Sequence, residues 1–267
     1  MGAMVSQGRA EYIDPVLQNL PALRRFMPRV ASQCAVCHSW PTTQVCQPCL
    51  ARFMPCQACC AMCALPLLTL LPSEPPQTSF RLCAACMRQR PPTDATLAAV
   101  PYAYPWSALI SRYKFGEQPG WADFFASLLM HTPGVAQALG ELGAQDWLLP
   151  LPLSAERLQT RGFTQAWELA SALARQSSTQ ARADTRLLLR PKHTRAQSQL
   201  GREARLANVR GAFQVDPLRS GELAGRRVVL VDDVMTSGAS LFAAAQALRD
   251  AGAARITALV LARTAPA

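Results

Sequence analysis

The sequence is poor in lysine, in acidic residues and in long apolar runs. Only two of its 27 basic residues are lysine, Lys114 and Lys192, and neither belongs to a Gly-Lys-Ser or Gly-Lys-Thr triplet. A Walker A phosphate-binding loop needs that triplet, so the chain is not itself a P-loop motor. Apolar runs stay well short of the roughly 18 residues that indicate a transmembrane helix, and none is expected.

The composition indicates a globular protein. Half of the 267 residues are hydrophobic and 16% are charged, whereas disordered chains combine low hydrophobicity with high net charge. The length suits one or two domains with ample material for a core. The first 30 residues carry Glu11 and Asp14 and lack the apolar core of a signal peptide, so a cytoplasmic location is expected.

Residues 228–240, VVLVDDVMTSGAS, predict a strand, an acidic turn and the start of a helix. Four consecutive aliphatic residues open the segment and indicate a strand buried on both faces, with Asp232 and Asp233 at its carboxyl end. The small residues that close the segment let the backbone turn tightly. A helix that stops at Gly252 and an apolar strand, Ile256–Leu261, complete a βαβ unit.

The order of these groups suits a phosphorylated sugar. A helix amino end with N–H groups and small hydroxyl side chains can bind a phosphate. The two carboxylates cannot bind that phosphate, because like charges repel, but they can accept hydrogen bonds from a diol. A 5-phosphorylated ribose offers a phosphate at one end and a vicinal diol at the other. The plainer alternative is a βα turn with a solvated pair of aspartates.

Residues 228–240 resemble, position for position, the signature that binds phosphoribosyl pyrophosphate (PRPP) in type I phosphoribosyltransferases. The resemblance implies that Asp232 and Asp233 bind the ribose hydroxyls and that Mg²⁺ is bound together with PRPP. It also implies a 5-phosphate site formed by Thr236, Ser237, Gly238, Ala239 and Ser240.

Further segments resemble the ComF family. Residues 149–166, LPLPLSAERLQTRGFTQA, are similar to its Pro-x-Pro-Leu…Arg…Arg-Gly-Phe-x-Gln segment. Residues 197–213, QSQLGREARLANVRGAF, are similar to its Gln-x-x-Leu…Arg-x-x-Asn-Val-x-Gly-Ala-Phe segment, and 114–116 match a short Lys-Phe-Gly motif. With the cysteines, the resemblance covers the chain from Cys34 to its end. It implies a role in DNA uptake or nucleic-acid handling, with single-stranded DNA and a DNA-uptake helicase as partners.

The resemblance also indicates residues for the pyrophosphate. In type I phosphoribosyltransferases the loop after the strand that ends near residue 151 binds pyrophosphate, which makes Arg157 and Arg161 candidates. Residues 191–209 occupy the place of the loop that closes over PRPP, and they contain Lys192 and Arg195. For each arginine, a position on a solvated helix face is the alternative.

All ten cysteines lie between Cys34 and Cys86, in five pairs of the Cys-x-x-Cys type. Two-residue spacing lets both sulfurs of a pair bind one ion, and a tetrahedral zinc takes two such pairs. In a cytoplasmic chain, disulfides are the weaker interpretation. Evenly paired cysteines favour zinc over an iron–sulfur cluster, and four thiolates leave no position for water, so the zinc is expected to be structural.

Spacing and the family pattern together predict two ligand sets. Nineteen residues separate Cys63 from Cys83, inside the zinc-ribbon range of about 15 to 20, whereas 23 residues separate Cys59 from Cys83. The ComF pattern Cys-x-x-Cys-x-x-Pro also begins at Cys60. Cys56 and Cys59 are left over, and their exchange with the neighbouring pair stays open. The expected sets are Cys34, Cys37, Cys46 and Cys49 for one zinc, and Cys60, Cys63, Cys83 and Cys86 for the other.

The chain is basic, with a formal net charge of +10. Eight thiolates with two zinc ions would lower that charge to about +6. The basic residues are concentrated in 151–227, which holds 14 Arg or Lys against six Asp or Glu. A polyanionic ligand would be attracted by that excess.

Hydrophobic periodicity predicts further elements between the cysteines and residue 228. Proline at position 101 places the first of them at a sheet edge. The expected elements are an edge strand Ala98–Tyr104, a helix from Leu109 to Gly116, a helix Trp121–His131, a buried strand Trp147–Leu151, a helix Phe163–Arg175 and a strand Arg186–Arg190.

The expected fold is an amino-terminal zinc-ribbon domain followed by an α/β domain with a mainly parallel sheet. The predicted divisions are an amino-terminal segment 1–33, a double zinc ribbon 34–90 and a phosphoribosyltransferase-like domain 91–267. The expected function is that of a PRPP-binding phosphoribosyltransferase-like protein, although no general base stands out. The alternative is a non-catalytic module that senses PRPP or phosphate and binds single-stranded DNA, for which few stacking aromatics are present.

Overall fold

The computed structural model describes residues 32–54, 58–67, 81–115, 120–154, 164–191 and 211–265. The chain divides into two compact units, Met1–Leu50 and Ala51–Ala267. The predicted amino-terminal segment 1–33 lies outside the described residues except for its last two positions. No helix of the described ranges is long and apolar enough to cross a membrane.

The larger unit contains a five-stranded sheet in which every pairing is parallel, in the order β1-β7-β6-β2-β3. This confirms the predicted α/β class with a mainly parallel sheet. A separate antiparallel pair joins β4 to β5. The strands are β1 Ala95–Pro101, β2 Trp147–Pro150, β3 Arg182–Ala183, β4 Leu188–Leu189, β5 Gln214–Val215, β6 Arg227–Met235 and β7 Arg255–Arg263.

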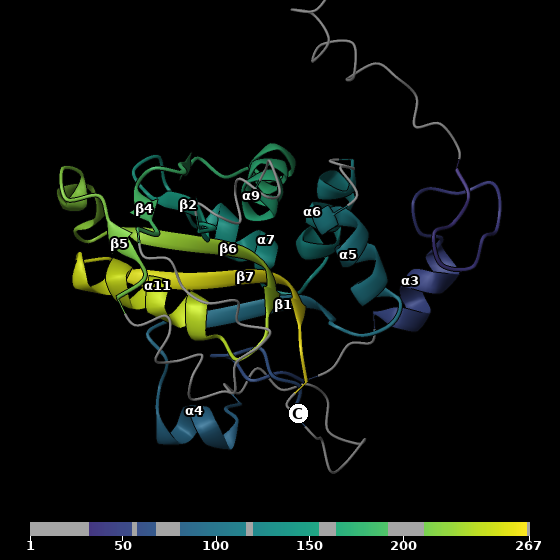
Figure 1. The fold of residues 1–267 in the computed structure, drawn as a ribbon, viewed down its shortest axis with the longest axis horizontal. Helices are drawn as coiled ribbons and strands as arrows, with labels where there is room; N and C mark the ends of the chain where they lie inside the picture. Colours follow the sequence, from purple (N-terminus) through teal and green to yellow (C-terminus); the bar gives the residue numbers. More distant parts are fainter. Residues whose placement is uncertain are drawn as a thin grey trace, which may run out of the picture. The chain divides into compact units, whose positions relative to one another are not determined.

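Helices cover both faces of this sheet. Figure 1 shows α6, α7 and α9 on one side and α11 with α4 on the other. The helices are α3 Gln47–Phe53, α4 Ala84–Arg88, α5 Trp106–Phe115, α6 Trp121–Met130, α7 Val135–Gly140, α9 Gln165–Gln176 and α11 Ala239–Asp250, with a 3-10 turn η2 at Ser220–Leu223. Because helices cover both faces, the central strands are apolar at nearly every position.

The core centres on β6 and β7. Every residue of β7 after Arg255 is buried, as are four consecutive aliphatic residues of β6. Each such Val, Leu or Ile contributes about 1.5 to 3 kcal/mol relative to an exposed side chain. One face of these strands packs against α11 through a cluster that includes Val228, Leu230, Ala258, Val260, Leu241 and Leu248.

The predicted elements occur, with altered ends. The first strand is an edge strand as expected, but it spans Ala95–Pro101 rather than 98–104, and its proline is its last residue. The predicted strand 186–190 is reduced to β4, which lies outside the main sheet. β6 continues to Met235, beyond the expected end of the strand, because β7 pairs with it as far as Arg263.

Candidate functional site

Two carboxylates lie near the carboxyl end of β6, where one of its neighbours has already ended. The pairing of β2 with β6 stops at Pro150↔Val231, whereas β7 pairs with Asp232 and the residues beyond it. Asp232 and Asp233 therefore occupy a stretch of β6 that has a strand on only one side. In parallel α/β sheets, ligands bind outside the carboxyl ends of strands at such positions.

An ammonium group contacts this carboxylate pair. Lys114 Nζ, at the end of α5, lies 3.0 Å from Asp233 Oδ1, and the two side chains are 17% and 12% exposed. The backbone N–H of Asp233 donates to Asp232 Oδ1 at 2.9 Å. The pair is thus held close together with one cation beside it.

Burial and the neighbouring carboxylate of Asp233 change the titration of Asp232. Burial raises the pKa of Asp232 to about 7, and the charge of Asp233 adds to the rise. The charges of Lys114 and Arg190 oppose the shift in this pKa, as does the hydrogen bond from the Asp233 N–H. Because the charge of Asp233 opposes ionisation of Asp232, the site favours a ligand or cation that relieves this repulsion.

The end of α5 is fixed by bonds to the start of α9. The buried Tyr113 donates its hydroxyl hydrogen to the carbonyl oxygen of Gln165 at 2.8 Å, and Gln165 Nε2 donates to the carbonyl oxygen of Lys114 at 3.2 Å. Burial, followed by the charge of Asp233, raises the pKa of Tyr113, so its hydroxyl stays protonated as a donor. These bonds hold Lys114 against the carboxylates.

The turn after β6 requires a glycine. Gly238 has φ +80°, and a Cβ there would stand 2.6 Å from both Met235 Cε and Phe242 Cε2. The Phe242 N–H donates to the Gly238 carbonyl oxygen at 2.8 Å, which starts α11. The first N–H groups of a helix have no acceptor within it, and the helix dipole makes this end positive. The turn can therefore receive an anion next to the carboxylates.

Sequence reasoning did not place Lys114 or Arg190 in the site. Arg190 follows β4, and its guanidinium lies over the Phe213 ring at 5.0 Å from the ring centroid. For Lys114, the sequence did offer an indication of a role in the site, because it is one of only two lysines and belongs to the Lys-Phe-Gly motif. No feature of the sequence indicated that the charge of Arg190 acts on Asp232.

The structure leaves several predicted site residues untested. Thr236, Ser237, Gly238, Ala239 and Ser240 form the turn and the start of α11, as described. The predicted pyrophosphate contacts lie outside the described residues: Arg157, Arg161, Lys192 and Arg195.

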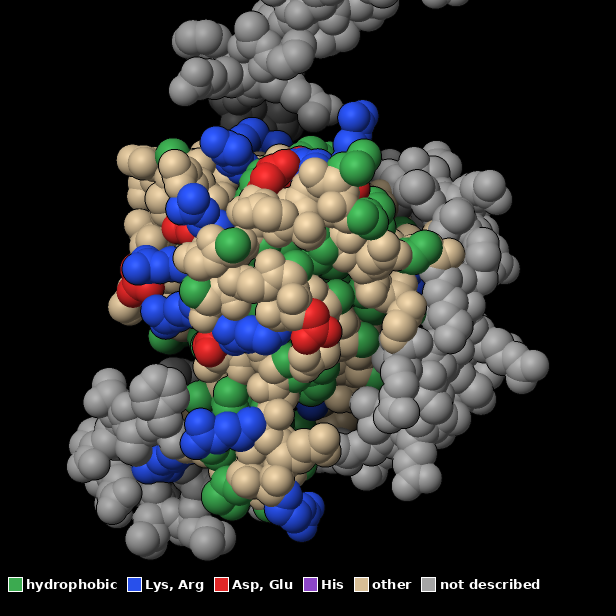
Figure 2. All heavy atoms as spheres, turned by 90° about the vertical axis from the view of Figure 1, so that its left-hand side faces the viewer, with side chains coloured by type: hydrophobic (Ala, Val, Ile, Leu, Met, Phe, Trp, Pro, Cys, Tyr) green, Lys and Arg blue, Asp and Glu red, His purple; other side chains and the backbone are tan. Residues whose placement is uncertain are grey.

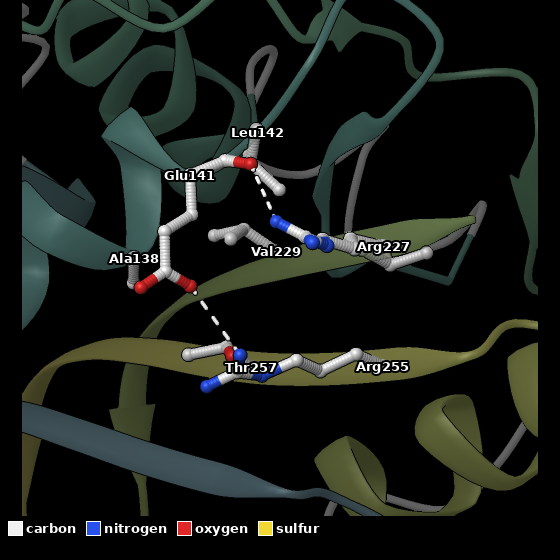
Figure 3. A pocket seen from close by; sticks show the side chains of 8 residues that line it. Ala138, Glu141, Leu142, Arg227, Val229, Arg255 and Thr257 are labelled. Carbon is white, nitrogen blue, oxygen red and sulfur yellow. Dashed lines mark hydrogen bonds and ion pairs between the residues drawn. The ribbon is translucent and has the colours of Figure 1, made fainter.

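A small pocket lies at the other ends of the strands. Figure 3 shows Arg227 and Arg255, the first residues of β6 and β7, directed toward Glu141. Arg227 donates to the Glu141 carbonyl oxygen at 2.8 Å, and Arg255 pairs with its carboxylate at 3.3 Å. Both arginines thus contact Glu141, at the ends of β6 and β7 opposite to the aspartate pair.

The cysteines form two clusters of four. In each cluster all four sulfurs lie within 4.8 Å of one another. Cys59 lies outside both clusters, and Cys56 lies outside the described residues. The first cluster is Cys34, Cys37, Cys46 and Cys49, and the second is Cys60, Cys63, Cys83 and Cys86.

The sulfur distances fit a tetrahedral zinc ion. A Zn–S bond of about 2.3 Å places the sulfurs of such a site about 3.8 Å apart. The sulfurs of Cys63 and Cys83 are 3.7 Å apart, and those of Cys37 and Cys46 are 3.5 Å apart. A disulfide would need about 2.05 Å, so these pairs are not bonded to each other. Both clusters could therefore hold zinc.

Some sulfurs of each cluster have a lowered pKa, which favours the thiolate: Cys34 and Cys37 in the first cluster and Cys60 in the second. Burial opposes ionisation of Cys34, but N–H donors from neighbouring backbone outweigh it and lower its pKa to about 6. The same balance brings the pKa of Cys60 to about 7. Burial raises the pKa of Cys49 to about 12, with hydrogen bonds to the other sulfurs adding to the rise. Metal ligation requires deprotonated sulfurs, and a bound cation would supply the missing stabilisation.

The second cluster belongs to the larger compact unit. Its cysteines are buried in the same core cluster as Val228, Val260 and Leu241 of β6, β7 and α11. Thr96 Oγ1 of β1 donates to the Met62 carbonyl oxygen at 2.8 Å. The boundary between the compact units, after Leu50, falls inside the segment predicted as one double ribbon, 34–90.

Basic side chains are dispersed on the face that Figure 2 shows, several of them beside acidic ones. Among the described residues, Arg219 pairs with Asp184 and with Glu222 at 2.9 Å each. Ion pairs of this kind reduce the positive potential available to a nucleic acid. The basic side chains visible on the described part of this face thus do not form one continuous patch.

The comparisons with known proteins define the class of the larger unit. The family model of the phosphoribosyl transferase domain matches residues 159–266. Together with the parallel sheet, this match shows that the larger unit contains a phosphoribosyltransferase-type domain. The solved structure of the allosteric regulatory enzyme of purine biosynthesis covers 47% of this chain and 26% of its own, at 23% identity and a TM-score of 0.28, and is too distant to add to the assignment.

Relatives then define the family. Competence protein F of Haemophilus influenzae is 34% identical over 182 residues, which cover 68% of this chain and 78% of that protein. DNA utilization protein YhgH of Escherichia coli K12 is 31% identical over 183 residues, with the same two shares of 68% and 78%. This chain belongs to the ComF family of competence proteins.

Proposed function

We propose that this protein binds PRPP, together with Mg²⁺, at the carboxyl end of β6. The observation that carries the proposal is that the carboxylate pair Asp232–Asp233 is followed at once by the Gly238 turn into α11. The carboxylates can accept the hydrogens of a ribose diol, and the helix amino end can receive the 5-phosphate. The phosphoribosyl transferase match spans both features.

The cations around the pair support a ligand with further phosphates. The Lys114 ammonium touches Asp233, and the Arg190 charge acts on Asp232. PRPP carries its pyrophosphate next to the ribose diol, so these cations would lie near it. Mg²⁺ would bridge ligand oxygens and neutralise part of their charge. Arg157, Arg161, Lys192 and Arg195 stay the predicted further contacts of the pyrophosphate.

We further propose that the bound PRPP undergoes phosphoribosyl transfer. A nucleophile forms a bond to C1 of the ribose while the bond from C1 to the pyrophosphate oxygen breaks. Pyrophosphate leaves with the bonding electrons, and the proton of the nucleophile passes to solvent. Because positive charge develops on the sugar, the protein would act chiefly by positioning the ligand and stabilising the leaving group.

The two cysteine clusters are proposed to hold two structural zinc ions. The sulfur distances support this, as does the saturation of each site by four cysteines. On this proposal the zinc-ribbon segment spans 34–90 and the transferase domain 91–267. The ions would stabilise segments that bury few large apolar side chains of their own.

The names of the relatives support a role of this chain in DNA uptake. One relative is named as a competence protein and the other as a DNA utilization protein. We propose that this chain acts in the cytoplasm in natural transformation or a related process, with single-stranded DNA and a DNA-uptake helicase as partners. A separate motor is needed, since the sequence contains no Walker A triplet.

Pyrophosphate release tests the catalytic proposal. The protein is incubated with PRPP, Mg²⁺ and a panel of acceptors, and Asp232→Asn serves as the variant with a damaged ribose site. Release by the wild type that falls in the variant supports transfer. Binding of PRPP without release, joined to a salt-dependent affinity for single-stranded DNA, would contradict it and favour the non-catalytic module.

A further inference from the structure

Arg263, the last residue of β7, joins the second cysteine cluster to the turn after β6. It is buried, with 9% exposure. Its Nε donates to the carbonyl oxygen of Cys63 at 2.9 Å. Its Nη1 donates to the carbonyl oxygens of Met235 at 3.2 Å, of Thr236, and of Thr264 at 2.7 Å. One side chain thus links the backbone of a cysteine of the cluster to the first residue of the phosphate turn.

The cluster also provides the countercharge for this buried guanidinium. A buried charge without a partner is costly. None of the ion pairs between described residues involves Arg263. Its Nε lies 2.9 Å from the carbonyl oxygen of Cys63, so the guanidinium lies beside the four clustered cysteines. Four thiolates around one Zn²⁺ carry a net charge of about −2, which would balance the guanidinium.

The cysteine segment next to Arg263 is fixed to the sheet. The Thr96 N–H donates to the Ala61 carbonyl oxygen at 2.9 Å, and Thr96 Oγ1 donates to that of Met62 at 2.8 Å. Arg263 donates to the next carbonyl group, that of Cys63. The consecutive carbonyl groups of residues 61, 62 and 63 therefore all accept hydrogen bonds from β1 or β7. A displacement of the cysteine sulfurs would therefore also displace the strand residues that are hydrogen-bonded to this segment.

We propose that Arg263 is a positioning residue that couples metal occupancy of the second cluster to the order of the turn Thr236–Ser240. A bound ion fixes the sulfurs and, with them, the Cys63 carbonyl group, which orients the guanidinium toward the end of β6. Loss of the ion removes both the fixed carbonyl and the countercharge, and the turn loosens while the sheet stays folded. Only the expected effect of this coupling on phosphate affinity rests on the proposed function; the coupling itself does not.

Amide hydrogen exchange resolved by NMR tests this coupling without any ligand. The Thr264 N–H donates to the Met235 carbonyl oxygen at 3.1 Å, and the Phe242 N–H donates to that of Gly238 at 2.8 Å, so these two amides report on the turn. The Ala253 N–H bonds to the last turn of α11 at 3.0 Å and serves as the internal reference.

Removal of zinc from the wild type with a chelator should speed exchange of both reporter amides by about tenfold or more, the effect of losing one charge-assisted hydrogen bond. Exchange of Ala253 should not change. Arg263→Met should accelerate the reporters with zinc still present, and should release zinc from one cluster faster. Arg263→Lys keeps the charge, so zinc release should stay close to the wild-type rate. Its single ammonium cannot span both sets of carbonyl groups, so the reporters should still exchange fast.

Arg255→Met is the matched control, because Arg255 lies at the opposite end of β7 with its side chain 54% exposed. It should alter neither zinc release nor the reporters. Unchanged reporters after chelation, equal acceleration at Ala253, or a wild type without metal in the second cluster would each overturn the coupling. Zinc removal from the wild type needs no substitution, so it still tests the coupling if Arg263→Met does not fold. Failure of PRPP to bind would contradict the proposed function alone.

Discussion

Replacement of Gly238 by alanine should damage both stability and ligand binding. The residue has φ +80°, which costs an L-residue roughly 1 to 2 kcal/mol. The added Cβ would also meet Met235 Cε and Phe242 Cε2 at 2.6 Å, closer than real Cβ contacts allow. Moving packed side chains aside costs about 1 to 3 kcal/mol. We therefore expect a loss of about 2 to 5 kcal/mol in the free energy of unfolding, and displacement of the N–H groups at the start of α11.

Gly225→Ala provides the matched control. Gly225 also has a left-handed backbone, with φ +72°, but a Cβ there would have no atom within 4 Å. The free energy of unfolding of this variant should fall only by the cost of the left-handed backbone, roughly 1 to 2 kcal/mol. Urea unfolding and calorimetric titration with PRPP and Mg²⁺ measure the two effects. Equal stability losses in the two variants, or unchanged PRPP affinity in Gly238→Ala, would refute the reasoning.

Three further outcomes are expected. Elemental analysis should find about two zinc ions per chain, and about one in Cys83→Ser; a count of zero, or iron instead, would contradict the ribbon assignment. Because the pKa of Asp232 rises from 3.8 to about 7 on folding, the folded state holds its proton longer, and stability should fall as pH rises through this window. Asp232→Asn should abolish up to about 4 kcal/mol of that fall, and an unchanged pH profile of unfolding would count against the shift. Lys114→Met removes the ammonium that opposes the shift, so the carboxyl carbon of Asp232 should titrate at higher pH in NMR spectra; a lower or equal midpoint would argue against the contact.

Local patterns predicted the strand, turn and helix of 228–240 well. Consecutive aliphatic residues indicate a buried strand whatever surrounds them, and small residues before an apolar helix indicate a tight turn. The end of β6 was placed too early, because Asp232 and Asp233 look like a strand terminus. Their neighbour β7 continues the hydrogen-bonded ladder as far as Met235. Pairing with a distant strand is not encoded in the local pattern.

Residues brought together by the tertiary fold could not be predicted. Lys114 reaches Asp233 only because α5 ends beside β6, and Arg263 reaches Cys63 only because β7 ends beside the second cluster. Cysteine spacing predicts which sulfurs can share an ion, since it depends on short loops. It does not show that the second cluster packs into the core of the larger unit, which depends on contacts such as that of Thr96 with Met62.

The most direct test of the ribose-phosphate site is calorimetric titration with PRPP and Mg²⁺. The wild type is compared with the double variant Asp232→Ala, Asp233→Ala, whose fold should persist because two repelling carboxylates are removed. Charge-assisted hydrogen bonds contribute roughly 1.5 to 3 kcal/mol each, so loss of each carboxylate should weaken binding by about tenfold to a hundredfold. Saturable binding by the wild type and a loss of at least this size in a folded double variant is the predicted result. Equal affinities in the two proteins, or no binding by the wild type, would contradict the account.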